Sequence, residues 1–184
     1  IHWRYFWLLL FPNELSCDYS LNCIPMIESW TDYRIIFPVL FYTFLVVVVG
    51  GGILAFRFTG ESSIEYHRYL AIYLYSWAVL LITFLPASNI FIYVGTLIGE
   101  RLLYLPSIGF CFLFALILCK LEKKLDNKFL KTLLSLLVLL YFVWLAQQTY
   151  NRNFDWQSEE TLFRSAEKVC PDSGKVQEVS VRYH

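Results

Sequence analysis

The sequence has few charged residues for its length. Only 16% of its 184 residues are charged, whereas 58% are hydrophobic, and the mean hydropathy is +0.52. Both fractions lie outside the usual range of soluble domains. A water-soluble core of this size cannot hide so much apolar surface, so the composition excludes an ordinary soluble protein and indicates a membrane protein.

Signals of several other functions are also absent. The formal net charge is +0 and no basic stripe occurs, so nothing supports binding to nucleic acid. The three His residues are scattered and no His and Cys cluster has zinc-ligand spacing, so we expect no metal site. The glycine cluster Gly50 to Gly52 lies inside an apolar run, where it is typical of close helix packing and not of a phosphate-binding loop.

Four apolar runs approach the roughly 20 residues that a helix needs to cross a bilayer. The alternative, that each run is a core helix of a large soluble protein, leaves too little polar sequence to cover them. The runs are too long for barrel strands and lack polar alternation, so the predicted fold is all-α with polytopic membrane helices. The expected spans are residues 35–56, 69–85, 102–119 and 130–146.

The first residues read as the end of a further span. His2 to Pro12 is apolar and aromatic, but about eleven residues cannot cross a bilayer. The chain has neither an initiator Met nor a signal peptide at this end. We therefore expect it to be an excerpt from a longer protein.

The orientation of the spans follows from the distribution of lysine. Five lysines lie in the connection from Lys120 to Lys131, which the positive-inside rule assigns to the cytosol. The loop at residues 13–33, the connection from Pro86 to Arg101 and the tail after Gln147 are then expected on the opposite side.

The tail loses the membrane composition and predicts a soluble helix from Tyr150 to Ser173. Asp155 or Ser158 is the expected N-cap, and Pro171 and Gly174 end the helix. A single amphipathic helix must pack on a partner, as the first helix of a helical-repeat solenoid does. The predicted domains are a membrane domain at residues 1–148 and a repeat region at residues 149–184. The expected apolar face of the helix consists of Leu162, Phe163, Ala166 and Val169.

Several segments together resemble the transmembrane and tetratricopeptide-repeat-containing (TMTC) family. Their order and spacing match the family from about residue 3 to Gln177, and the Glu-Arg-Leu-Leu-Tyr-Leu-Pro-Ser run is long enough to be specific. After Gln177 the chain no longer follows the repeat pattern. Either a truncated gene end or a genuine short form of the protein would explain this. The matching segments are Cys17 to Ser20, Ile24 to Met26, Leu85 to Asn89, Gly99 to Phe110 and Asn153 to Phe163.

The resemblance implies a protein O-mannosyltransferase of the endoplasmic reticulum membrane. The fold would be part of a GT-C type membrane domain followed by lumenal tetratricopeptide repeats. Dolichyl-phosphate mannose would be the donor, with no further cofactor, and membrane lipid and lumenal acceptor proteins would be the partners. The family's catalytic Asp-Asp pair belongs to an amino-terminal half that is absent here. The resemblance therefore implies that this excerpt contains no catalytic residue and is inactive alone.

The chemistry still indicates substrate-binding candidates. Transfer from a lipid phosphate needs a base for the acceptor hydroxyl and cationic donors for the phosphate. Arg101 is the best candidate for the phosphate, because it is expected at headgroup depth and a guanidinium grips phosphate oxygens with paired hydrogen bonds. Glu100 points about 100° away on a helix and can anchor a neighbouring helix. The alternative is an interfacial Glu100–Arg101 ion pair, and Tyr104 either bonds Glu100 or belongs to the aromatic interface belt.

Asp18 and the cysteines complete the candidates. Asp18 either orients an acceptor or is simply a solvated loop acid. Cys17 and Cys23 share a loop on the predicted oxidising side and can pair, and Cys170 stays free or bridges elsewhere.

Three functional classes remain open from the sequence. The first is the transferase, and the second is a non-catalytic membrane-anchored repeat scaffold that binds proteins of the endoplasmic reticulum. A transporter is the weakest reading, because no predicted span has an ionisable residue near its centre.

Overall fold

The computed structural model describes residues 1–19, 23–24, 31–58, 64–91 and 98–183, and its regular elements are helices. No strand occurs in these ranges. The predicted loop at residues 13–33 falls partly outside them, at residues 20–22 and 25–30. The helices are α1 (His2–Leu10), α2 (Ile36–Phe58), α3 (Ile64–Phe84), α4 (Tyr104–Lys124), α5 (Lys128–Asp155), α6 (Glu159–Val169) and α7 (Gly174–Tyr183), with the short 3-10 helices η2 (Tyr33–Ile35), η3 (Leu85–Ser88) and η4 (Glu100–Leu103).

The four long helices α2 to α5 are apolar and long enough to cross a membrane. Each corresponds to one of the expected spans. They bury little of their apolar surface inside the chain: at most 22% of the apolar segment of any of them is buried, and none of that of α5. Leu, Val and Phe side chains in this state need lipid or further protein around them. The predicted class, an all-α multi-pass membrane protein, is therefore confirmed.

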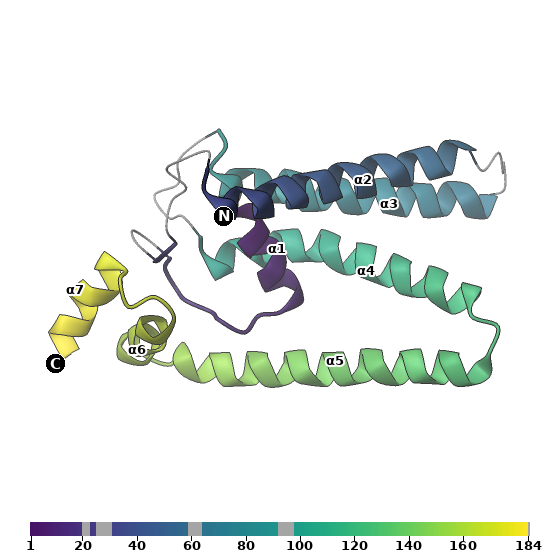
Figure 1. Ribbon diagram of the computed structural model, residues 1–184. Coiled ribbons are helices and arrows are strands. Elements are labelled where there is room, and N and C mark those ends of the chain that lie inside the picture. The colour runs from purple at the N-terminus through teal and green to yellow at the C-terminus, as the bar shows by residue number, and fades with distance from the viewer. Residues whose placement is uncertain (20–22, 25–30, 59–63, 92–97, 184) are drawn as a thin grey trace.

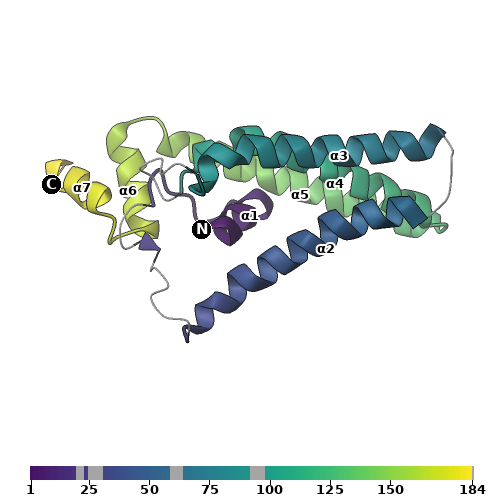
Figure 2. The same cartoon turned by 90° about the horizontal axis from the view of Figure 1, so that it is seen from above.

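The long helices alternate in direction (Figure 1). α2 and α3 meet at the end where residues 59–63 join them, and α4 and α5 meet at the same end. Seen from above, α2 diverges from α3 toward the other end, and α1 lies in the space between α2 and the other helices (Figure 2). The most extensive packing joins α3 to α4.

Small residues allow α3 and α4 to approach closely. A Cβ atom at Gly109 of α4 would lie 2.5 Å from the carbonyl oxygen of Ser76 and 2.6 Å from the amide nitrogen of Leu80. Tyr73, Leu113 and Leu116 form a buried cluster along the same contact. Membrane helices associate through this kind of close approach, because lipid gives no hydrophobic drive for helices to pair.

The glycine cluster of α2 contacts α3 through one residue. A Cβ atom at Gly52 would overlap the Tyr73 ring, while Gly50 and Gly51 have nothing within 4 Å of such an atom. The Tyr73 hydroxyl donates a hydrogen bond to the Val48 carbonyl oxygen at 2.6 Å. Close helix packing is thus confirmed for Gly52 alone.

The lysine-rich connection is shorter than expected. α4 continues to Lys124 and α5 starts at Lys128, so most of the lysines lie on helix ends and only residues 125–127 connect the helices. Lysine is a good helix former and is favourable near a helix C-terminus. Lys123 pairs with Glu65 of α3, which places the start of α3 at the same end as the lysines.

The end of α5 also differs from the prediction. α5 runs without a break to Asp155, so residues 150–155 belong to it and not to the soluble helix, and it crosses the predicted domain boundary at residue 148. Gly and Pro, which would end a helix, are absent from this stretch. The division into domains stays a prediction.

The soluble helix itself is confirmed as α6, with Ser158 as its N-cap. The Ser158 hydroxyl accepts a hydrogen bond from the Thr161 amide at 3.1 Å. α6 packs on α7, and Ala166 of its expected apolar face is fully buried. α7 continues beyond Gln177 to Tyr183, and whether α6 and α7 begin a tetratricopeptide array stays a prediction.

Close packing at Gly109 leads to a first prediction. Gly109→Ala pushes a methyl group against the α3 backbone, which cannot move aside as a side chain can. We expect a loss of about 1–3 kcal/mol in stability. The matched control is Gly51→Ala, whose methyl group meets no atom within 4 Å. The measurement is the thermal unfolding midpoint of both variants in detergent, and equal midpoints would contradict the α3–α4 contact.

Candidate functional site

The functional candidates gather at the end of the helices opposite the lysine-rich connection. Here α1, residues 13–19, η4, the end of α5 and the start of α6 come together (Figure 1). Their shared core is a buried cluster that draws on the membrane helices, the first loop and the tail. Its members are Tyr5, Leu8, Tyr19, Ile98, Leu103 and Cys170.

Hydrogen bonds at both ends of α1 hold it among the long helices. His2 bonds the Ser88 carbonyl oxygen through Nε2 at 2.8 Å, and the Tyr5 hydroxyl accepts the Gly99 amide at 3.1 Å. At the other end, Tyr141 of α5 donates to the Leu10 carbonyl oxygen at 2.8 Å. The Tyr5 bond fixes the residue that directly precedes η4, and with it the position of Glu100 and Arg101.

Glu100 pairs with an arginine of another helix. Its Oε1 lies 2.7 Å from a guanidinium nitrogen of Arg152, near the end of α5. The two side chains are only 13% and 11% exposed. Arg152 also donates to Asp155 at 2.8 Å and to Ser165 of α6 at 2.7 Å. Glu100 therefore anchors a neighbouring helix, as one of the two sequence interpretations expected, and the interfacial Glu100–Arg101 pair is not formed.

Arg101 and Tyr104 take no part in this network. Arg101 is exposed, and no carboxylate of the described residues pairs with it. Tyr104 is 78% exposed. Because Glu100 is bonded to Arg152, the aromatic-belt interpretation fits Tyr104 better than a bond to Glu100. The candidates thus divide into a buried anchor, Glu100, and two exposed side chains one turn apart.

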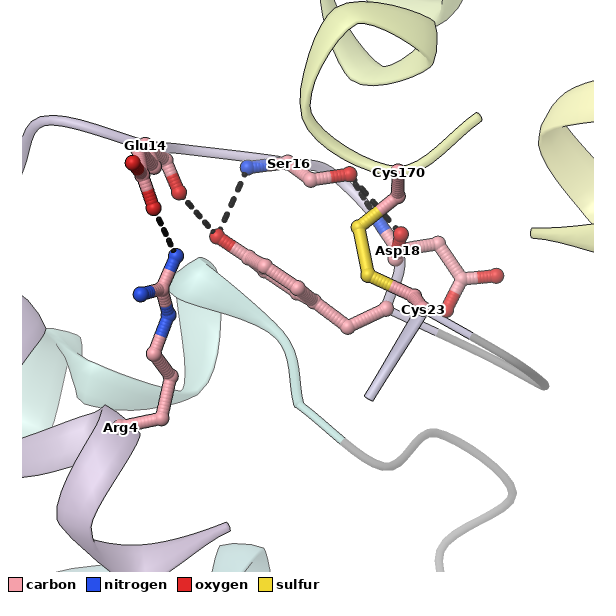
Figure 3. The surroundings of a disulfide bond; sticks show 7 residues. Arg4, Glu14, Ser16, Asp18, Cys23 and Cys170 are labelled. Carbon is pink, nitrogen blue, oxygen red and sulfur yellow. Dashed lines mark hydrogen bonds and ion pairs between the residues drawn. A yellow bond between two sulfur atoms is a disulfide. The ribbon is translucent and has the colours of Figure 1, made fainter. Parts of the chain in front are cut away.

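Asp18 is buried, not solvated as a loop acid would be. It is 5% exposed and lies in a loop that is closed by its own hydrogen bonds (Figure 3). The Ser16 hydroxyl donates to the Asp18 carbonyl oxygen at 2.8 Å, and the Tyr19 hydroxyl donates to the Glu14 carbonyl oxygen at 2.5 Å. Arg4 of α1 pairs with the Glu14 carboxylate at 2.5 Å. The solvated-acid interpretation of Asp18 is therefore wrong, and a substrate contact by Asp18 stays a prediction.

A disulfide joins the first loop to the tail. Cys23 is bonded to Cys170, across 147 residues of sequence (Figure 3). Cys17 is a free thiol. Of the alternatives that the sequence left open, the structure therefore has Cys170 in a bridge and does not form the Cys17–Cys23 pair. Burial raises the pKa of the Cys17 thiol; the Arg152 guanidinium lowers it, and the carboxylates of Asp18 and Glu100 raise it further.

Two partners in this site were missed from the sequence. Arg152 was overlooked as the partner of Glu100, and Cys170 as the partner of Cys23. The position of Arg152 in the sequence was a usable signal. Arg152 follows the fourth apolar run and Glu100 precedes the third, so both residues lie at the same depth. No such signal distinguishes Cys170 from Cys17. Within the described residues no group of three or more His, Cys, Asp or Glu side chains is placed to hold a metal ion.

The buried ion pair leads to a second prediction. Glu100→Gln leaves Arg152 buried with Asp155 as its only carboxylate, and we expect a loss of about 1–3 kcal/mol in stability. The matched control is Glu160→Gln, which breaks an exposed i,i+4 pair with Arg164 and should cost about 0–0.5 kcal/mol. Denaturant unfolding of the full-length protein measures both. A loss no larger than that of the control would show that the pair does not hold η4 to α5.

The fold and this site together define a multi-pass membrane protein whose soluble helices are fastened to one end of its spans. Comparison with known proteins narrows the class. A family model described as "Protein O-mannosyl-transferase TMTC, DUF1736" matches residues 1–46. The human Protein O-mannosyl-transferase TMTC3 is 39% identical over 171 residues, which cover 92% of this chain and 17% of that protein. No solved structure matches the chain.

Two further relatives agree. The Caenorhabditis elegans Protein O-mannosyl-transferase F38B6.6 is 35% identical over 96% of this chain and 23% of its own length. The human Protein O-mannosyl-transferase TMTC4 is 38% identical over 92% of this chain and 21% of its own length. The chain belongs to the TMTC family of protein O-mannosyl-transferases. It spans about a fifth of the length of these curated relatives.

Proposed function

We propose that this chain is part of an enzyme of the endoplasmic reticulum membrane that transfers mannose from dolichyl-phosphate mannose to Ser or Thr of lumenal proteins. The relatives' shared name supports a mannosyl transferase, and the four apolar helices support a lipid-linked donor. The proposal for individual residues rests on one observation at η4. The Glu100 side chain is only 13% exposed and is paired with Arg152, whereas its neighbour Arg101 is exposed.

Arg101 is proposed to bind the donor phosphate. It lies at the end of a membrane helix, where the headgroup of a lipid would be. A guanidinium offers paired donors to phosphate oxygens, and these hydrogen bonds strengthen as the phosphate gains charge during transfer. Tyr104 lies on the next turn and is exposed at the same depth, where it can contact the headgroup.

Glu100 and Arg152 are proposed as positioning residues. Their buried pair ties η4 to α5, and the Tyr5 hydroxyl holds the Gly99 amide on the other side. Pro106 lies in the first turn of α4, where proline fits a helix and the missing N–H breaks no bond. The short segment that bears Arg101 is thus fixed from three directions, so little conformational entropy is lost when a ligand binds.

The compartment that Arg101 faces is inferred from two features, one at each end of the long helices. The lysine-rich connection indicates the cytosolic end. The Cys23–Cys170 disulfide lies at the other end, and disulfides persist in oxidising compartments such as the lumen of the endoplasmic reticulum. These two signals are independent and support the same orientation.

No catalytic base is assigned to these residues. Asp18 is buried in its closed loop and is a weaker candidate than Arg101 for contacting the substrate. The base is proposed to be supplied by the acidic pair of the family's amino-terminal half. The described residues would then supply the phosphate contact and the frame that holds it.

A non-catalytic scaffold is the second candidate function. The attachment of α6 to α5 and to the first loop favours it as well, because it holds the start of a binding solenoid at a defined place. A full-length protein that binds its partners but transfers no mannose from the lipid donor would favour the scaffold.

The phosphate contact leads to a third prediction. In the full-length enzyme, Arg101→Ala should raise the KM for dolichyl-phosphate mannose about 10- to 100-fold, because charge-assisted hydrogen bonds contribute about 1.5–3 kcal/mol each. Arg101→Lys keeps the charge without the paired geometry, so we expect an intermediate KM. The measurement is mannosyl transfer at limiting and saturating donor.

The matched control is Arg164→Ala, which removes an exposed arginine of α6 that pairs with Glu160. Its donor KM should stay at the wild-type value. An unchanged donor KM in Arg101→Ala, with transfer intact, would remove Arg101 from the donor site.

A further inference from the structure

The disulfide connects two parts of the molecule that the sequence separates widely. Cys23 lies in the loop between α1 and α2, and Cys170 is the residue at which α6 ends. Their Cα atoms are 5.1 Å apart, within the ordinary range for a disulfide. The bond therefore runs from the membrane domain to the soluble tail.

Cys170 is enclosed by residues of the membrane domain. It is 1% exposed and belongs to the same buried cluster as Tyr5 and Leu8 of α1 and Leu103 of η4. Its own turn is closed locally, since the Cys170 amide donates to the Ala166 carbonyl oxygen at 2.8 Å and the Ser173 amide donates to the Cys170 carbonyl oxygen at 3.2 Å. The end of α6 is thus seated in the core, and the sulfur–sulfur bond is not its sole attachment.

A second attachment lies on the other side of α6. Ser165 accepts a hydrogen bond from Arg152, which is held by Glu100 of η4. α6 is consequently fixed near its middle by a polar contact and at its end by the disulfide. Two attachments on one short helix prevent it from turning about α5.

We propose that the Cys23–Cys170 disulfide is a structural cross-link that fastens α6 and α7 to the membrane domain, so that soluble repeats and membrane helices move as one body. Closing a loop of 147 residues strongly restricts the unfolded chain, which is where a cross-link has its largest effect. The repeats that follow α7 in a longer chain would start from a fixed direction relative to η4.

The bond forms by thiol–disulfide exchange. One cysteine thiolate attacks a disulfide-bearing oxidant, either a protein disulfide or oxidised glutathione, and gives a mixed disulfide. The other cysteine thiolate then attacks the mixed disulfide, which completes the Cys23–Cys170 bond and releases the oxidant as two thiols. The two cysteines lose two electrons and two protons, and the oxidant takes up both. Cys17 is a free thiol and takes no part in this bond.

Peptide mapping of the wild-type full-length protein tests the pairing without any variant. Free thiols are blocked with N-ethylmaleimide before lysis, and the protein is digested without reduction. Trypsin combined with cleavage before Asp releases Cys170 in the peptide of residues 169–171 and separates Cys17 from Cys23 at Asp18. We expect the Cys170 peptide to be linked to the Cys23 peptide and Cys17 to carry the maleimide. A maleimide-labelled Cys170, or a link from Cys17 to either cysteine, would overturn the proposal.

Hydrogen exchange tests whether the bond fastens the tail. In Cys23→Ser we expect amide exchange in α6 to rise about tenfold or more, because the end of the helix is released from the core. Cys17→Ser is the matched control from the same loop and should leave α6 exchange unchanged. Equal exchange in the two variants would show that the disulfide is present but does not hold the tail, and would also overturn the proposal. Neither readout depends on mannosyl transfer.

Discussion

Alternation in the direction of the four long helices is the constraint on which the other features depend. A helix that crosses a bilayer satisfies its backbone groups internally, whereas a chain that stops within the hydrocarbon does not. Consecutive spans with short connections must therefore run up and down in turn. This brings the start of α4 and the end of α5 to one end, although Glu100 and Arg152 are 52 residues apart. The lysine-rich connection lies at the other end, where Lys123 pairs with Glu65.

The end that bears Glu100 combines three kinds of contact in a small region. Aromatic side chains such as Tyr5 and Tyr19 fill the core and use their hydroxyls to hold backbone groups. The Glu100–Arg152 pair links two membrane helices, and Ser165 extends it to the tail. The disulfide closes the same region covalently. Breaking one partner of such a network leaves a buried polar group unsatisfied, so its members stabilise one another. Arg101, directly beside it, is exposed.

Local patterns in the sequence were sufficient to predict the helices but not the contacts between them. Apolar runs predicted all four spans, and Ser158 was one of the two N-caps expected for the soluble helix, because both signals depend on neighbouring residues. Residues 150–155 were assigned to the wrong helix, since polar composition marks the membrane edge and not the end of a helix. The Cys23–Cys170 and Glu100–Arg152 partners depend on long-range packing. Spacing alone cannot select among three cysteines on one side, nor show that Asp18 is buried.

The proposed donor contact requires that Arg101 and the tail face the compartment opposite the lysine-rich connection. The most direct measurement uses full-length protein in sealed vesicles from the endoplasmic reticulum, an impermeant maleimide and two variants at exposed positions, Arg101→Cys and Asp126→Cys. The wild-type protein serves as the background for the native thiols. We predict that Asp126→Cys is labelled in intact vesicles, whereas Arg101→Cys is labelled only after the membrane is permeabilised. Labelling of Arg101→Cys in intact vesicles would contradict the orientation and the donor contact built on it.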